Sequence, residues 1–349
     1  MSYNFPYGTY TVLVTPFMQS ESKELTEDEL DELTDEEFAE YYKSKRSVDF
    51  ANIKKWVDFQ CKSNVEGLVL LGTTSESPTL KRDEQFEIVK YVSEENKKHA
   101  TPKFLVVGVG GNDTYENLCF ARKCAQYCDA FMVTVPSYSK PTQDGIFEHF
   151  KIICSNKRVS TKPVIIYNIP SRAGVNMDPM TIKNVCSACK NVVAIKEASG
   201  SIDQLIKIRE IVPELKVFSG DDKLVLDVVS HGGCGVISVA SNVIPNLISY
   251  VVTLCLSNDF KSAREIYYEA CLPRFIEMLF CETNPIPVKY MMHMIGLYEN
   301  HVMRLPITEL SESKEKSVMS ALEFTLEKDA HYNKKLCEFT MTSSEFTEE

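Results

Sequence analysis

The sequence predicts an α/β protein folded as a (β/α)₈, or TIM, barrel with a C-terminal helical extension. Eight short apolar runs rich in Val, Ile and Leu occur along the chain, and segments with a helical period separate them. Runs of this kind are typical of strands buried on both faces, and their alternation with helices indicates a parallel sheet. Eight strands favour closure into a barrel. The alternative is an open doubly wound sheet, which would require a G-x-G-x-x-G turn that does not follow the first run.

Each predicted strand ends in Gly, Thr, Val, Asn, Lys or Ser. The predicted strands are residues 10–15, 67–72, 104–108, 130–135, 164–168, 192–196, 217–219 and 235–238. Apolar residues at helical spacing predict the helices between them. These are residues 83–99, 117–127, 145–155, 178–189, 201–212 and 223–231.

Three regions depart from the βα repeat, and they divide the chain. Residues 1–258 are expected to form the barrel, with an acidic surface insertion at about 18–45. Thr26 and Thr34 each precede a Glu by three residues, which predicts capping boxes on one or two short solvated helices. Residues 259–328 are expected to form three helices after the barrel, and residues 329–349 a polar tail that frays over residues 334–349.

The composition excludes several classes of partner. The formal net charge is −11 and no basic cluster stands out, so we expect no nucleic-acid partner. No apolar run approaches the length that spans a bilayer, and the first residues do not resemble a signal peptide. The 12 cysteines are scattered as small apolar residues. We therefore expect a soluble, cytoplasmic protein in a reducing compartment, with small molecules or other chains as partners.

Lys196 is the leading candidate for catalysis. It ends an apolar run, so its amine is expected at the mouth of the barrel, where reactive groups of this fold gather. An apolar environment disfavours the ammonium form, and a neutral amine can attack a ketone to form a Schiff base. The alternative is a structural ion pair with Glu197 or Asp221.

Polar residues at the ends of other strands extend this candidate site. Tyr167 ends the neighbouring strand, and a proton relay through Thr74 and Tyr138 could serve imine formation. Thr73 and Thr74 could hold a carboxylate at a strand-to-helix turn, and Arg172 could bind a second carboxylate. For either tyrosine, the alternative is a hydrogen-bonded core aromatic. Asp221 and Asp222 have no evident third ligand, so no metal is expected.

Six ordered motifs resemble the dihydrodipicolinate synthase and N-acetylneuraminate lyase family. The similarity runs from Gly8 to about Leu310 and skips the acidic insertion. The motifs are Gly-Thr-Thr-Ser-Glu-Ser-Pro-Thr-Leu (72–80), Tyr-Asn-Ile-Pro-Ser-Arg-Ala-Gly (167–174), Ala-Ile-Lys-Glu-Ala-Ser-Gly (194–200), Ser-Gly-Asp-Asp (219–222), Gly-Gly-Cys-Gly-Val-Ile-Ser-Val (232–239) and Asn-Pro-Ile-Pro-Val-Lys (284–289).

This resemblance implies a role for each matching residue. It implies that Lys196 forms the imine and that Tyr167, Thr74 and Tyr138 relay protons, with Tyr138 supplied across a dimer interface. It also implies that Thr73, Thr74 and the backbone of Ile237 bind pyruvate. The resemblance further implies a homotetramer built from two dimers.

The resemblance also implies an effector site, which is incomplete here. Asn112 and Glu116 match the family's lysine feedback site, whereas Arg82 and Gln85 replace residues that are often His. Ser75 stands where the family has glycine, which would cost stability if that position required a positive φ.

The predicted activity is that of a lyase that condenses pyruvate with aspartate semialdehyde to 4-hydroxy-tetrahydrodipicolinate. Arg172 favours this branch, because sialic-acid lyases usually lack an arginine there. No cofactor is expected, since the protonated imine is itself the electron sink. The alternatives are an N-acetylneuraminate lyase, another pyruvate-dependent aldolase, or a barrel that has lost catalysis and acts as a binding protein.

Overall fold

In the computed structural model, which describes residues 3, 5–19 and 25–343, eight parallel strands close into a barrel in sequence order. This confirms the predicted fold. The strands are β1 (Gly8–Val12), β2 (Gly67–Leu70), β3 (Phe104–Val109), β4 (Ala130–Thr134), β5 (Val164–Asn168), β6 (Val192–Glu197), β7 (Lys216–Ser219) and β8 (Gly235–Ser238).

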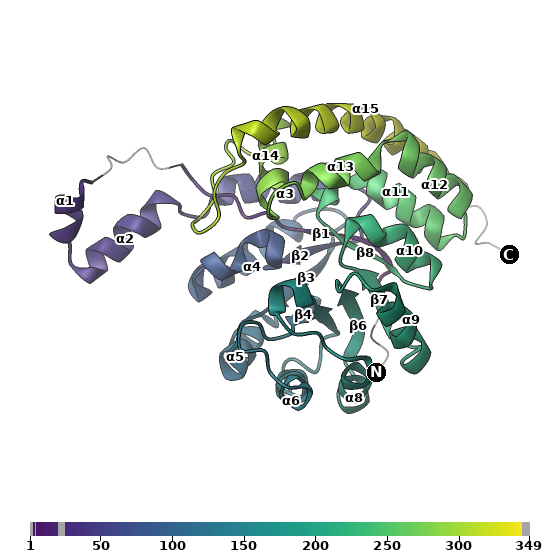
Figure 1. The fold of residues 1–349 in the computed structure, drawn as a ribbon, viewed down its shortest axis with the longest axis horizontal. Coiled ribbons are helices and arrows are strands. Elements are labelled where there is room, and N and C mark those ends of the chain that lie inside the picture. Colours follow the sequence, from purple (N-terminus) through teal and green to yellow (C-terminus); the bar gives the residue numbers. More distant parts are fainter. Residues whose placement is uncertain (1–2, 4, 20–24, 344–349) are drawn as a thin grey trace.

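Helices surround the barrel; seven of them connect successive strands, and α11 follows the last strand (Figure 1). They are α3 (Phe50–Cys61), α4 (Arg82–Asn96), α5 (Thr114–Cys124), α6 (Gln143–Cys154), α8 (Pro179–Ala188), α9 (Ile202–Ile211), α10 (Val225–Ser230) and α11 (Pro245–Leu256). Helix α5 begins three residues earlier than predicted, because the Asp113 carboxylate accepts the N–H groups of Tyr115 and Glu116 and caps the helix.

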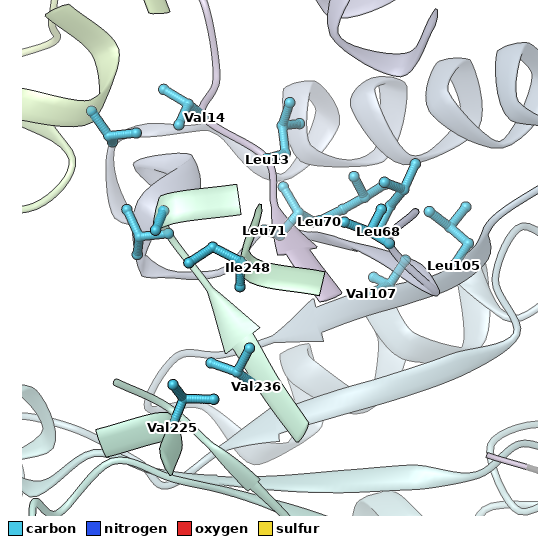
Figure 2. Packing of buried hydrophobic residues seen from close by; sticks show 14 of the residues in the cluster. Leu13, Val14, Leu68, Leu70, Leu71, Leu105, Val107, Val225, Val236 and Ile248 are labelled. Atoms are coloured by element: carbon cyan, nitrogen blue, oxygen red, sulfur yellow. The ribbon is translucent and has the colours of Figure 1, made fainter. Parts of the chain in front are cut away.

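Side chains alternate along each strand between two apolar layers. Leu68 and Leu70 of β2 belong to the outer layer between strands and helices, whereas Val69 belongs to the barrel interior. Figure 2 shows part of the outer layer, in which Leu68 and Leu70 of β2 are paired in register with Leu105 and Val107 of β3. The same alternation puts Ala194 inside the barrel, and therefore also Lys196 two residues later.

Four aromatic rings fill the barrel from the end at which the strands begin. Phe5 stacks on Tyr10 with 5.4 Å between ring centroids, and it meets Phe104 and Phe218 edge-on at 5.2 and 5.4 Å. Phe5, Tyr10 and Phe218 are at most 1% exposed. We call these four residues the aromatic floor.

The described part of the acidic insertion, residues 18–19 and 25–47, projects from the barrel as an arm (Figure 1). The Phe17–Val48 bridge and a 2.8 Å hydrogen bond from Met18 N to Ser47 O close its base. The described part contains α1 (Glu27–Asp31) and α2 (Asp35–Lys45). Both predicted capping boxes are present, with Thr26 and Glu29 on α1 and Thr34 and Glu37 on α2.

The C-terminal segment differs from the prediction in two ways. It holds four helices rather than three: α12 (Phe260–Glu269), α13 (Leu272–Leu279), α14 (Ile286–Met294) and α15 (Glu312–Ser343). Helix α15 also crosses the predicted boundary at residue 328. Asp329 anchors it there, because its carboxylate accepts the N–H of Leu247 in the first turn of α11 at 2.8 Å.

The rest of the predicted frayed tail, residues 344–349, lies outside the described residues. In the described part of the chain, no helix combines the length and the hydropathy needed to cross a bilayer.

Candidate active site

Lys196 lies where the sequence placed it, near the end of β6 and 4% exposed. Its register partner on β5 is Tyr167, and its Nζ is 4.3 Å from the centroid of the Tyr167 ring. Tyr167 is 3% exposed. The structure therefore brings a buried primary amine against the face of a buried phenol, as predicted from their positions at the ends of adjacent strands.

The structure removes the alternative of an ion pair for Lys196. Among the ion pairs of residues 3, 5–19 and 25–343, none includes this lysine. Glu197 instead accepts hydrogen bonds from Asn168 Nδ2, Gln204 Nε2 and the N–H of Ser199. Asp221 accepts the N–H of Lys223 at 2.9 Å. Both candidate acidic partners are therefore occupied elsewhere.

Thr73 and Thr74 belong to a single 3₁₀ turn, η1 (Thr73–Ser75), that follows β2. Thr73 Oγ1 is 3.4 Å from the Tyr167 hydroxyl, and either can donate. Thr74 Oγ1 instead accepts from Asn284 Nδ2 at 3.0 Å. The sequence predicted that Thr74 would contact Tyr167. Successive side chains diverge around a 3₁₀ turn, so only one of the two threonines faces the phenol here.

Ser75 does not strain this turn. The left-handed conformation falls on the next residue, Glu76, with φ 52°. Ser75 Oγ donates to Leu13 O, and Ser75 O accepts from Thr15 Oγ1, both at 2.7 Å. The hydroxyl therefore ties the turn to the segment after β1, and the expected cost of replacing glycine does not arise.

Arg172 lies on α7 (Pro170–Ala173), one turn after the end of β5. Its Nη2 donates to Asn284 O at 3.2 Å. Asn284 thus contacts both Thr74 and Arg172, and its Oδ1 is buried without a hydrogen-bond partner among the described residues. Asn284 begins the Asn-Pro-Ile-Pro-Val-Lys motif, but its position in the sequence does not predict these contacts.

A cavity of about 700 Å³ opens over this group of residues. Thr73, Tyr167, Arg172 and Asn284 line one part of it. Lys196 and Ile237 do not line it, and Ile237 packs with Tyr167 in the barrel interior at 1% exposed. The cavity is large enough for two small carboxylic acids, with Arg172 as a cation at its wall.

Tyr138 is not brought to the site within the chain. It lies in the loop between β4 and α6, is 90% exposed and has φ 59°. A positive φ is costly for a bulky residue, and such strain clusters at functional positions. The proton relay predicted for Tyr138 therefore needs a second copy of the chain.

Of the two candidate effector residues, Glu116 lines this same cavity and Asn112 does not. Glu116 pairs with Arg82 through Nε at 3.1 Å, whereas Asn112 is exposed. Arg82 also donates to Gln85, to Gly110 O and to Asn117 at 2.8–2.9 Å. The Glu116 carboxylate is thus already paired with Arg82 of the same chain. An effector role for Asn112 and Glu116 stays a prediction.

No group of three or more metal-binding side chains occurs in the part of the chain that the structure describes. Asp222 has another role, since it is buried and accepts from Ser238 Oγ and from the N–H groups of Val239 and Ala240. It therefore caps the turn after β8.

Comparisons with known proteins agree with this geometry. A model of the dihydrodipicolinate synthetase family matches residues 38–325. The 4-hydroxy-tetrahydrodipicolinate synthase of Endomicrobium trichonymphae is 37% identical over 90% of this chain and 97% of its own.

Two solved structures carry ligands. The enzyme from Cyanidioschyzon merolae with lysine bound has a TM-score of 0.79 and 30% identity, covering 91% of this chain and 98% of its own. The chloride-inhibited dihydrodipicolinate synthase from Acinetobacter baumannii, complexed with pyruvate, has a TM-score of 0.78 and 27% identity, covering 92% and 99%. With its barrel, its buried lysine and these matches, the chain belongs to the dihydrodipicolinate synthetase family.

Proposed function

We propose that this protein condenses pyruvate with aspartate semialdehyde to give 4-hydroxy-tetrahydrodipicolinate and water. One observation carries the proposal: Lys196 is buried against Tyr167 at the end of β6 and has no acidic partner among the described residues. The relatives named as 4-hydroxy-tetrahydrodipicolinate synthases support this choice of reaction.

The first half of the reaction forms a covalent intermediate on Lys196. Its Nζ attacks the ketone carbon of pyruvate, the carbon–oxygen bond breaks, and one water leaves to give a protonated imine. The Tyr167 hydroxyl, beside Thr73 Oγ1, supplies the proton that the departing oxygen needs. The N–H groups at the start of the Thr73–Ser75 turn hold the pyruvate carboxylate.

The second half joins the two substrates. The imine loses a methyl proton to become an enamine, whose carbon attacks the aldehyde carbon while the aldehyde oxygen gains a proton. The amino group of the second substrate then displaces Lys196 and closes the ring. Arg172 binds the carboxylate of this second substrate. The imine takes up the electrons, so the proposed chemistry needs no cofactor or metal.

The proposal includes association of the chain with itself, as a homotetramer of two dimers. Tyr138 supports this, because its exposed and strained position suits a side chain that enters a partner's site. We also propose a cytoplasmic location. The free cysteines among the described residues are consistent with a reducing compartment.

Borohydride trapping tests the covalent step. Incubation with pyruvate and borohydride should add the mass of one reduced pyruvate adduct, and peptide mapping should locate it at Lys196. A Lys196→Ala variant should gain no mass, whereas Lys216→Arg on the neighbouring strand should be labelled like the wild type. Absence of an adduct at Lys196 would exclude the proposed chemistry. Rates with aspartate semialdehyde and with N-acetylneuraminate then identify the substrate.

A further inference from the structure

Glu76 connects the substrate-binding turn to a buried charge network. It follows Ser75 directly, adopts φ 52° and ψ 31°, and is 1% exposed. A left-handed conformation costs energy for any residue with a Cβ, and it persists only where the surroundings enforce it. The contacts of the Glu76 side chain are therefore expected to fix this backbone.

Those contacts come from the C-terminal segment. Lys289 of α14 pairs with Glu76 Oε1 and also donates to Val302 O at 3.1 Å. The N–H of Arg304 donates to Glu76 Oε2 at 3.3 Å. The Phe17 ring covers the Lys289 amine, with 4.4 Å from Nζ to the ring centroid. Both carboxylate oxygens of Glu76 are thus held by residues far along the chain.

Stability alone is a weak explanation for this pair. Lys289 is 1% exposed, and burial lowers its pKa while the Glu76 carboxylate acts against that effect. Desolvation of two charges offsets much of their attraction, and apolar residues of the same shape often stabilise a protein equally well. A buried ion pair beside a strained backbone position suggests that its contribution is to geometry.

The turn is held from two sides. On one side, Ser75 is bonded to Leu13 and Thr15, which follow β1. On the other side, Glu76 is bonded to Lys289 and to the N–H of Arg304. Thr73 and Thr74 lie between these anchors and the end of β2, so their N–H groups depend on both.

We propose that Glu76 and Lys289 form a positioning pair, which holds the Thr73–Thr74 turn in the geometry that receives the carboxylate of the 2-oxo acid. The C-terminal segment thereby becomes part of the substrate site, although Lys289 touches no substrate. This inference rests on the proposed function, because it needs pyruvate as the ligand of the turn.

The test measures the pyruvate concentration at which half of the protein is trapped by borohydride. In Glu76→Gln and in Lys289→Met it should rise at least about tenfold, because the turn loses its anchor. The double variant Glu76→Gln/Lys289→Met removes both charges, so it avoids an unpaired buried charge and should regain thermal stability. The double variant should nevertheless bind pyruvate as weakly as the single variants do. In the double variant, backbone amides in a peptide covering residues 71–76 should also exchange hydrogen faster than in the wild type.

Leu205→Ala, on the buried face of α9, provides the control, since it should lower stability at a site far from the turn. Its half-trapping concentration should stay within about twofold of the wild type. A folded double variant that binds pyruvate like the wild type would overturn the positioning role. Failure of the wild type itself to be trapped would overturn the proposed function, and the positioning role with it.

Discussion

At the scale of single residues, Arg172 is a cation that lines the cavity beside Tyr167 and Asn284, and Lys81 and Arg82 line the same cavity. Arg172→Ala should raise the KM for aspartate semialdehyde by about 10- to 100-fold, the range expected for losing a charge-assisted hydrogen bond. The pyruvate concentration for half-maximal trapping should change little, because the proposed binding site of pyruvate is the Thr73–Ser75 turn and not Arg172. Steady-state kinetics with both substrates check this. Arg158→Ala, at an exposed position, is the control, and equal effects on both substrates would contradict the assigned role.

The residues at strand ends could be predicted because their placement follows from the fold. In a barrel the end of every strand faces the same mouth, so locating the apolar runs also located Lys196, Tyr167 and Thr73. Asn284 could not be placed in this way. It lies in the segment after the barrel, and its contacts with Thr74 and Arg172 depend on how that segment folds back.

At the scale of secondary-structure elements, His149 links α6 to the start of α5. Its ring Nδ1 is 2.8 Å from Thr114 Oγ1, and its Nε2 is buried without a hydrogen-bond partner among the described residues. Burial lowers the pKa of His149 to about 4. The folded protein therefore favours the neutral ring.

This lowered pKa sets the direction of a pH effect on stability. Because the folded value lies below the ordinary 6.5, the contribution of His149 is present above pH 6.5 and is lost as the pH falls towards 4. The loss is at most about 3 kcal/mol, at roughly 1.36 kcal/mol per pKa unit. His149→Asn should lose less stability than the wild type between pH 7 and pH 4.5 in urea unfolding. His231→Asn, at an exposed position, should follow the wild type, and identical curves for all three would refute the prediction.

Elements defined by local signals were predicted well, and those defined by distant contacts were not. The capping boxes at Thr26 and Thr34 need only residues three positions apart, and both formed as predicted. The predicted boundary at residue 328 was wrong, because α15 continues to Ser343. The hydrogen bond from the N–H of Leu247 to Asp329 joins residues that are 82 positions apart in the sequence, so no local pattern predicts it.

At the scale of the whole molecule, the position of Tyr138 predicts that the active site is shared between copies. Co-expression of Tyr138→Phe with Lys196→Ala should restore activity, because a mixed dimer carries one site with both Tyr138 and Lys196. For random pairing, about a quarter of the sites are intact. The rate of the purified mixture, compared with each variant alone, checks this. Activity no higher than the average of the two variants would exclude a shared site.

The aromatic floor bears on how the two substrates reach Lys196. Phe5, Tyr10, Phe104 and Phe218 pack together at the end of the barrel where the strands begin. The cavity beside Thr73 and Tyr167 lies at the other end, where the strands finish. Under the proposed chemistry, pyruvate must react with Lys196 before the aldehyde does, because the aldehyde is attacked by the enamine that pyruvate forms there. With the floor filled by aromatic rings, both substrates would then reach Lys196 from the same end of the barrel, one after the other.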